Sequence, residues 1–365
     1  MTAQPPPGRL GDPSMTVLTD PRTHPIIKQT LSALGMGEEP LPDLPPTLSV
    51  DSLTPIIAAN DAAFTAVSES LDNELPSDSS EPEISVTEHT IAGPDANPIR
   101  LWIYTPVAAA AAARAPLPAV VYLHGGAMVF IPTETKVHRR WTRSLAAQGA
   151  IAVLVDFRNA FTPPSTRNPF PAGLNDCAAA AQWLAAHRAE LGIGNIVLQG
   201  ESGGANLAIA TALKAKREGW LEGAVAGVYG IVPYVSNGSG WSEERKLAEL
   251  PSLVENDGYV LSGAGMAAFG WYYGEDVLED PRAWPYHASE EELRGLPPVV
   301  LEMAELDPLR DEGVAFARKL VAAGVQVRAS VAVGLVHGAQ VAFRKALPEQ
   351  HEAAARDVVG FARSL

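Results

Sequence analysis

A serine flanked by glycines, at the junction of an apolar strand and a helix, constrains this chain more than any other feature. The stretch Gly200-Glu-Ser-Gly-Gly204 follows the apolar run 195–199 and precedes the helical run 205–213. Strand, Gly-x-Ser-x-Gly and helix together form the context of a nucleophile elbow. Side chains two residues from the serine would clash with backbone in so tight a turn, and glycine removes the clash. The pattern predicts that the Ser202 hydroxyl stands at a helix N-terminus, which favours developing negative charge.

The pattern needs support from elsewhere in the chain. With 31 glycines in 365 residues, a Gly-x-Ser-x-Gly arises by chance at about 0.1–0.2 per chain. The alternative interpretation is an ordinary glycine-rich turn between a strand and a helix. Further parts of a hydrolytic site must therefore follow in the right order and context.

Composition bounds the class of protein. A chain of 365 residues with 47% hydrophobic residues suits one large α/β domain with insertions. The net charge of −15 argues against nucleic-acid partners and anionic membranes. A single cysteine, Cys177, excludes an internal disulfide and a cysteine metal cluster. Because the N-terminus has no apolar signal region and no run has the roughly 18 apolar residues of a membrane span, we expect a cytoplasmic protein.

Strand and helix patterns alternate over most of the chain. The early strands at 84–91 and 99–104 have no helix between them, which predicts an antiparallel start before a parallel sheet with helical crossovers. The alanine run 108–113 fits either a short helix or a surface loop. The other predicted strands are 119–123, 151–157, 196–199, 224–231, 299–302 and 325–333, and the predicted helices are 134–148, 172–191, 203–217, 311–323 and 344–363.

Two segments depart from this alternation. Residues 1–80 carry amphipathic helical patches. Around their end lies the acidic, Ser/Pro-rich stretch 76–82, whose composition is typical of a linker. Residues 233–285 are rich in aromatic residues and helical patches, and we expect them to form an insertion. The prediction is a catalytic domain at 81–365, with a helical cap built from the N-terminal segment and this insertion.

A His-Gly-Gly-Ala loop supplies the second part of a site. The loop His124–Ala127 directly follows an apolar strand. In acyl transfer, backbone N–H groups stabilise the negative charge on the carbonyl oxygen, and each is worth about 2.7–4 kcal/mol. Gly125, Gly126 and Gly203 are the predicted donors of this oxyanion hole. His124 itself is expected to brace the loop and not to carry a proton.

An acid and a base follow the serine in the chain. Asp307 comes after an apolar strand, where α/β sheets place their sites, although Asp followed by Pro also begins many helices. Asp311 is the competing acid but should already lie in the helix. His337 lies in a Gly-flanked loop, whereas His351 lies in the terminal helix and looks like a surface residue. The order of serine, acid and histidine is that of α/β-hydrolases.

With these motifs the chain resembles carboxylesterases of the hormone-sensitive lipase family, bacterial family IV. The resemblance covers about residues 80–365 and implies an α/β-hydrolase fold with a mostly parallel eight-stranded sheet flanked by helices. Three departures stand out: Ala127 replaces the usual third glycine, Gly203 replaces a common alanine, and Phe157 replaces a common tyrosine. The first two keep their N–H groups. The chain also retains His337, which hormone receptors built on this fold have lost.

The resulting hypothesis is a serine carboxylesterase that needs no cofactor and no metal. Ser202 is the nucleophile, His337 the base and Asp307 the residue that orients it. The expected substrate is a small ester with a short to medium acyl chain, including esters of bulky alcohols. The alternatives are a macrolactone hydrolase and, from another class, a non-catalytic ligand-binding protein; a homodimer is left open. The predicted apolar pocket residues are Met128, Phe130, Tyr234 and Trp271.

Overall fold

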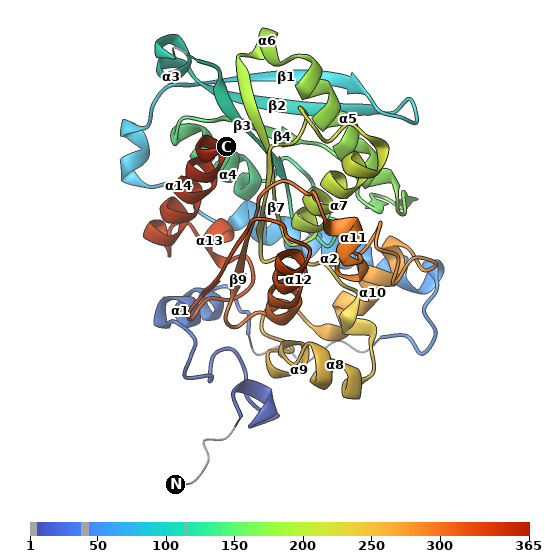
Figure 1. Cartoon of the computed structure of the whole chain (residues 1–365). Coiled ribbons are helices and arrows are strands. Elements are labelled where there is room, and N and C mark those ends of the chain that lie inside the picture. The colour runs from blue at the N-terminus through green and yellow to red at the C-terminus, as the bar shows by residue number, and fades with distance from the viewer. Residues whose placement is uncertain (1–5, 38–43, 114) are drawn as a thin grey trace.

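An eight-stranded sheet runs through the computed structural model, which describes residues 6–37, 44–113 and 115–365 (Figure 1). The strand order is β1-β2-β4-β3-β7-β8-β9-β10. Its strands are β1 Ile84–Ala92, β2 Pro98–Pro106, β3 Leu117–Leu123, β4 Ile151–Val155, β7 Ile193–Glu201, β8 Gly227–Ile231, β9 Val299–Ala304 and β10 Val327–Ala332.

The pairing of the strands follows from their connections. β1 pairs with β2, and β2 with β4, in antiparallel register, whereas all later pairs are parallel. The short connection between β1 and β2 permits only their antiparallel pairing, and parallel neighbours need a crossover that a helix provides. The predicted mostly parallel sheet with an antiparallel start is therefore confirmed. A small hairpin of β5 Phe161–Thr162 and β6 Thr166–Arg167 was not predicted.

Helices fill the crossovers at the predicted places, with small differences at their ends. The predicted helix 172–191 divides after Ala186, and the predicted helix 344–363 begins only at Pro348. The alanine run forms the short helix α3. The helices are α1 Pro25–Ala33, α2 Val50–Ser70, α3 Val107–Ala112, α4 Lys136–Ala147, α5 Ala172–Ala186, α6 Arg188–Leu191, α7 Gly203–Glu218, α8 Glu243–Glu249, α9 Ser252–Glu255, α10 Gly263–Tyr273, α11 Glu290–Leu293, α12 Arg310–Ala322, α13 Ala339–Ala342 and α14 Pro348–Ser364.

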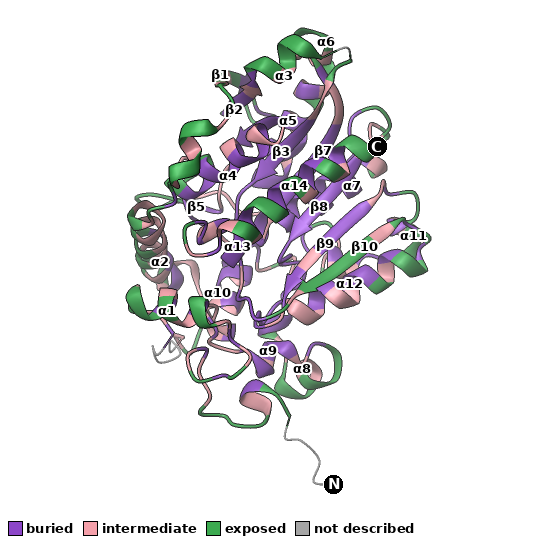
Figure 2. Cartoon of the chain, turned by 90° about the vertical axis from the view of Figure 1, so that its left-hand side faces the viewer, coloured by how far each residue is buried: buried purple, intermediate pink, exposed green. Residues whose placement is uncertain are grey.

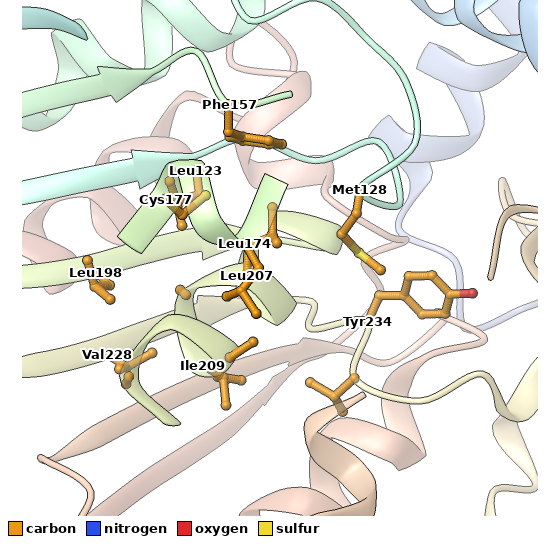
Figure 3. Close-up of a cluster of buried hydrophobic side chains, with 14 of the residues drawn as sticks. Leu123, Met128, Phe157, Leu174, Cys177, Leu198, Leu207, Ile209, Val228 and Tyr234 are labelled. Atoms are coloured by element: carbon orange, nitrogen blue, oxygen red, sulfur yellow. The ribbon is translucent and has the colours of Figure 1, made fainter. Parts of the chain in front are cut away.

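Two apolar layers cover the faces of the sheet. Alternate residues of β3 point to opposite faces, so that Val121 joins the layer under α5, α7 and α12, while Tyr122 joins the layer under α4 and α14. Figure 3 shows part of the first layer, to which Cys177 of α5, Leu207 of α7 and Leu198 of β7 belong. Cys177 is fully buried, as expected for a small core residue. The central strands are buried on both sides, and β10, at the sheet edge, is largely exposed (Figure 2).

The N-terminal segment and the insertion meet over one end of the sheet. Helix α2 contacts α10, and α9 contacts the 3-10 turn Gly8–Leu10 (Figure 1). Both α2 and α10 contribute side chains to a cavity at the point where β7 ends. The two segments that break the sequence pattern therefore cover the C-terminal end of the central strands.

The stretch predicted as a linker is held in place by ion pairs. Residues Pro76–Ser80 form a 3-10 turn, and Asp78 accepts a hydrogen bond from the Arg344 guanidinium at 2.8 Å. Glu81 pairs in the same way with Arg140. Both arginines are almost fully buried, so their charges need these carboxylates. A composition-based prediction misses this anchoring because the partner arginines lie far away in the sequence.

Candidate active site

Ser202 occupies a strained turn between β7 and α7. Its backbone angles are φ 55° and ψ −122°, a conformation that L-residues rarely adopt. A side chain at Gly200 would place its Cβ 2.1 Å from the Gly204 carbonyl oxygen, and one at Gly204 would lie 1.9 Å from the Leu123 carbonyl oxygen. The flanking glycines are therefore required by close backbone approach. The turn leaves Ser202 at the N-terminus of a 16-residue helix.

The loop His124–Ile131 lies against this turn. A Cβ at Gly203 would come within 2.5 Å of the Met128 backbone nitrogen, so the loop and the serine turn are in direct backbone contact. Gly126 has φ 103°, and a Cβ there would lie 2.1 Å from the Phe130 carbonyl oxygen. Small residues at both positions allow the N–H groups of the loop to approach the serine.

His124 fixes the orientation of the first peptide of this loop. Its Nδ1 lies 2.7 Å from the carbonyl oxygen of Gly125, and its Nε2 lies 3.1 Å from Thr133 Oγ1. Because a trans peptide points its C=O and N–H in opposite directions, the N–H of Gly126 points away from His124. His124 is fully buried, and burial lowers its pKa to about 4. It is therefore a neutral bracing residue, as the sequence indicates.

The predicted oxyanion donors are free to bind a ligand. Among the described residues, no acceptor takes a hydrogen bond from the backbone N–H of Gly125, Gly126 or Gly203. The N–H of Ser202 is different, because it donates to the Ile231 carbonyl oxygen at 2.9 Å. Unpaired N–H groups beside a nucleophile can bind an anionic oxygen.

Asp307 and His337 meet across the ends of β9 and β10. The distance from His337 Nδ1 to Asp307 Oδ2 is 2.8 Å. The other carboxylate oxygen accepts a hydrogen bond from the Leu309 N–H at 2.9 Å. Since a carboxylate only accepts, His337 Nδ1 carries the proton and Nε2 keeps its lone pair.

The competing interpretation of the acid is not supported by the structure. Asp307 does not cap a helix directly, because α12 begins at Arg310 and its N-cap residue is Leu309. Asp311 lies inside the helix, as expected, and pairs with Arg310 at 2.8 Å. Asp307 is fully buried and faces His337, which the spacing of residues along the sequence alone does not show.

Ser202 and His337 line the same cavity of about 140 Å³, together with Gly126 of the loop. Its walls are mostly apolar and come from the cap helices and the loop. Helix α2 contributes residues on one face, at positions 64, 67, 68 and 71, which is the spacing of one side of a helix. The remaining apolar wall includes Ala127, Phe130, Met266, Phe269 and Phe343.

The structure corrects most of the predicted pocket. Of the four predicted residues, Phe130 lines the cavity and stacks edge-on against Phe269, with ring centroids 4.8 Å apart. Tyr234 is fully buried, and its hydroxyl donates to the Met266 carbonyl oxygen at 2.9 Å. Met128 and Tyr234 belong to the buried cluster of Figure 3, and Trp271 packs against that core. Aromatic type alone did not separate core residues from lining residues.

Glu201, the residue before the nucleophile, is a site residue that the motif did not single out. It lines the cavity, and its Oε2 accepts a hydrogen bond from the Tyr122 hydroxyl at 3.3 Å. Its Oε1 lies 2.8 Å from where a Cβ of Gly125 would stand. Burial raises the pKa of Glu201 to about 7, against the opposing effects of His337 and the Tyr122 hydroxyl. Its charge state therefore changes near neutral pH.

His351 is not the surface residue that its place in the terminal helix suggested. It is fully buried, with Nε2 2.8 Å from Ser144 Oγ and Nδ1 2.9 Å from the Gln340 carbonyl oxygen. Burial lowers its pKa to about 3. It connects α14 to α4 and lies on the opposite side of the sheet from α7. This role is structural.

Neither a metal-binding cluster nor a membrane-spanning helix is found among the described residues. Within 6–37, 44–113 and 115–365, no group of three or more His, Cys, Asp or Glu side chains could hold a metal ion. No helix in this part of the chain combines the length and apolar character that a membrane crossing requires.

Comparisons with known proteins define the class. A family model of the α/β-hydrolase fold matches residues 120–341. Esterase LipI of Mycobacterium tuberculosis is 35% identical over 326 residues, which cover 88% of this chain and 95% of LipI. Carboxylesterase NlhH of the same organism is 32% identical over 290 residues, covering 78% of this chain and 84% of NlhH.

Solved structures narrow the class further. The structure of brefeldin A esterase, described as a bacterial homologue of human hormone-sensitive lipase, is 48% identical, has a TM-score of 0.92 and covers 98% of both chains. Esterase Est22 is 31% identical with a TM-score of 0.82, covering 95% of this chain and 98% of its own. This chain therefore belongs to the carboxylic ester hydrolases of the α/β-hydrolase fold that are related to hormone-sensitive lipase.

Proposed function

We propose that this esterase hydrolyses short- to medium-chain carboxylic esters through an acyl-enzyme formed on Ser202. The observation that carries the proposal is the 2.8 Å hydrogen bond between Asp307 and His337 at a cavity that Ser202 also lines. This bond leaves the lone pair of His337 Nε2 available to take a proton.

In the first half of the reaction, Ser202 Oγ attacks the ester carbonyl carbon and transfers its proton to His337 Nε2. The carbonyl oxygen becomes negative and accepts hydrogen bonds from the N–H groups of Gly125, Gly126 and Gly203. The C–O bond to the alcohol then breaks, and the alcohol leaves with the proton from His337. Asp307 stabilises the charged imidazole in between.

In the second half, water replaces the alcohol. His337 takes a proton from water, whose oxygen attacks the acyl carbon, and the same N–H groups stabilise the oxyanion. The bond to Ser202 Oγ breaks, the serine regains its proton from His337, and the carboxylic acid leaves. Only the unprotonated imidazole can accept a proton, so both halves of the reaction begin with neutral His337.

The size of the cavity supports a short acyl chain. An apolar cavity of about 150 Å³ holds one benzene-sized molecule. The cavity beside Ser202 measures about 140 Å³, so it accommodates a group of about four to six carbons without movement of the cap. Its apolar walls favour a hydrocarbon chain over a charged one.

A series of nitrophenyl esters from acetate to palmitate tests the proposal. We expect the highest kcat/KM at about four to six acyl carbons and at least tenfold less beyond twelve. Ser202→Ala should abolish turnover, while the same change at the exposed Ser77 should leave it intact. Absence of turnover by the wild type, or full activity of Ser202→Ala, would refute the proposal.

A second candidate substrate is the ester of a bulky or cyclic alcohol, such as a lactone. The observation in its favour is the relative at 48% identity that is named as an esterase of brefeldin A. Ring opening of lactones by wild type, with loss of activity in Ser202→Ala, would support it. The non-catalytic alternative is disfavoured, because the chain belongs to an enzyme class and keeps the serine, acid and histidine.

A further inference from the structure

His138 of α4 stands in the wall of the same cavity with an unused hydrogen-bond acceptor. Its Nδ1 lies 3.2 Å from the Pro132 carbonyl oxygen and 3.1 Å from the Thr133 carbonyl oxygen. Carbonyl oxygens only accept hydrogen bonds, so Nδ1 must carry the proton. A neutral imidazole protonated at Nδ1 has a lone pair on Nε2.

The surroundings of His138 keep it neutral. The residue is 3% exposed, and its ring stacks on that of His124 with centroids 4.7 Å apart. The edge of the Tyr122 ring faces it at 6.1 Å. Burial, together with the neighbouring His124, lowers the pKa of His138 well below its ordinary value. A second proton on the ring is therefore disfavoured.

No described residue donates to His138 Nε2, although the residue lines the cavity beside Ser202, Glu201 and His337. A polar atom that has no hydrogen-bond partner in the protein is normally satisfied by water or by a ligand. Most of the other lining groups are apolar. The lone pair of Nε2 is thus one of a few polar features in a mostly apolar wall.

We propose that His138 forms a hydroxyl-binding subsite, and that the preferred substrates of this enzyme are esters that carry a hydroxyl group in their acyl or alcohol part. The substrate hydroxyl donates its proton to Nε2, which an ether or a plain hydrocarbon cannot do. The proposal rests on the ester hydrolase function above and narrows its substrate class.

Further polar groups lie near His138 or line the same cavity. Tyr122, whose ring faces His138, donates its hydroxyl to Glu201, so His138 and Glu201 contact the same tyrosine. Ser68 of α2 lines the cavity as well. A hydroxyl held by Nε2 still has lone pairs that can accept a further hydrogen bond. The subsite therefore suits an alcohol better than it suits an ammonium group.

Matched substrates test this inference directly. Nitrophenyl esters of butyrate, hydroxybutyrate and methoxybutyrate form the acyl series, and propyl, hydroxypropyl and methoxypropyl butyrate form the alcohol series. In at least one of the two series, we expect the wild type to hydrolyse the hydroxy ester with about five- to tenfold higher kcat/KM than the plain ester and the methoxy ester. The methoxy ester controls for inductive activation, because it keeps the oxygen and lacks the donor.

Two variants of the same residue then assign the preference to Nε2. In His138→Asn the side-chain amide can still donate where Nδ1 does but has no atom at Nε2, so the preference should fall to about one. In His138→Gln a polar atom reaches the Nε2 position, and part of the preference should return. Labelling of Ser202 by a fluorophosphonate and a thermal melt report whether each variant folds.

The outcomes are distinguishable. If wild type hydrolyses the esters with no hydroxyl preference in either series, the subsite is refuted and the esterase proposal stands. If no ester in the set is hydrolysed, the proposed function itself fails. A preference that survives unchanged in His138→Asn also refutes the subsite, since another group must then hold the hydroxyl. The comparison of substrates with the wild type needs no variant, so it can refute the proposal even if a variant misfolds.

Discussion

Replacing Glu201 by glutamine tests whether the carboxyl beside the nucleophile holds a proton near neutral pH. Glu201 lies against Tyr122 and beside the Gly125 backbone, in the wall of the cavity. Burial raises its pKa from 4.5 to about 7. Glutamine keeps the shape and the acceptor for the Tyr122 hydroxyl but cannot ionise.

The sign of the effect follows from the raised pKa. The folded protein binds the proton of Glu201 more tightly than the unfolded chain does. The bound proton therefore adds to the free energy of unfolding, fully below pH 4.5, and this stabilisation is lost as the pH rises through 7. At about 1.4 kcal/mol for each pH unit of difference, the loss amounts to about 3 kcal/mol. Glu201→Gln avoids this loss because it has no charge to bury.

Urea unfolding of wild type and Glu201→Gln at pH 5 and pH 8.5 measures the effect. The stability advantage of the variant should grow by roughly 2–3 kcal/mol between the two pH values. Glu222→Gln, a change at an exposed position, should show no such growth. A difference between wild type and Glu201→Gln that stays constant across this range would refute the reasoning.

Three further predictions concern the site. Asp307→Asn should lower kcat by about 10³–10⁴ and also slow the labelling of Ser202 by a fluorophosphonate, because the imidazole loses its orienting partner; an effect on KM alone would contradict this. Gly203→Ala should lower kcat at least about tenfold at similar KM, since its Cβ would meet the loop backbone at 2.5 Å; a fully active variant would show that the loop yields. Phe269→Ala should lengthen the preferred acyl chain and cost about 3–5 kcal/mol in urea unfolding; an unchanged chain-length profile would place this ring outside the acyl site.

The sheet was predictable from sequence because its pattern is local. The central strands of the sheet are apolar runs bounded by turn residues, and the crossovers between the parallel strands carry a helical period. The order of Ser202, Asp307 and His337 along the chain was equally readable, since each follows the end of a strand. The contact between Asp307 and His337 was inferred from that order and is seen as a hydrogen bond.

The cavity lining was not predictable in the same way. Tyr234 and Trp271 have the residue types of a pocket, yet they pack in or against the core, because a large aromatic ring suits either place. The lining residues at 64, 67 and 71, in α2 and at its C-cap, have helical spacing. Which face of α2 lines the cavity, however, could be assigned only once the position of the insertion was known. His351 was misjudged for a related reason: its burial depends on Ser144, which is distant in sequence.

Helix α2 reaches the catalytic loop as well as the substrate cavity. Its Asp61 accepts a hydrogen bond from the Ile131 N–H at 2.8 Å, and Ile131 has φ 74°, a conformation that a β-branched residue rarely adopts. Phe64, one turn further on, stacks against Phe130 of the same loop. An exchange of this helix between related enzymes would therefore alter the chemical step and the substrate range together. Engineering of either property must treat the N-terminal segment as part of the catalytic unit and not as a replaceable cover.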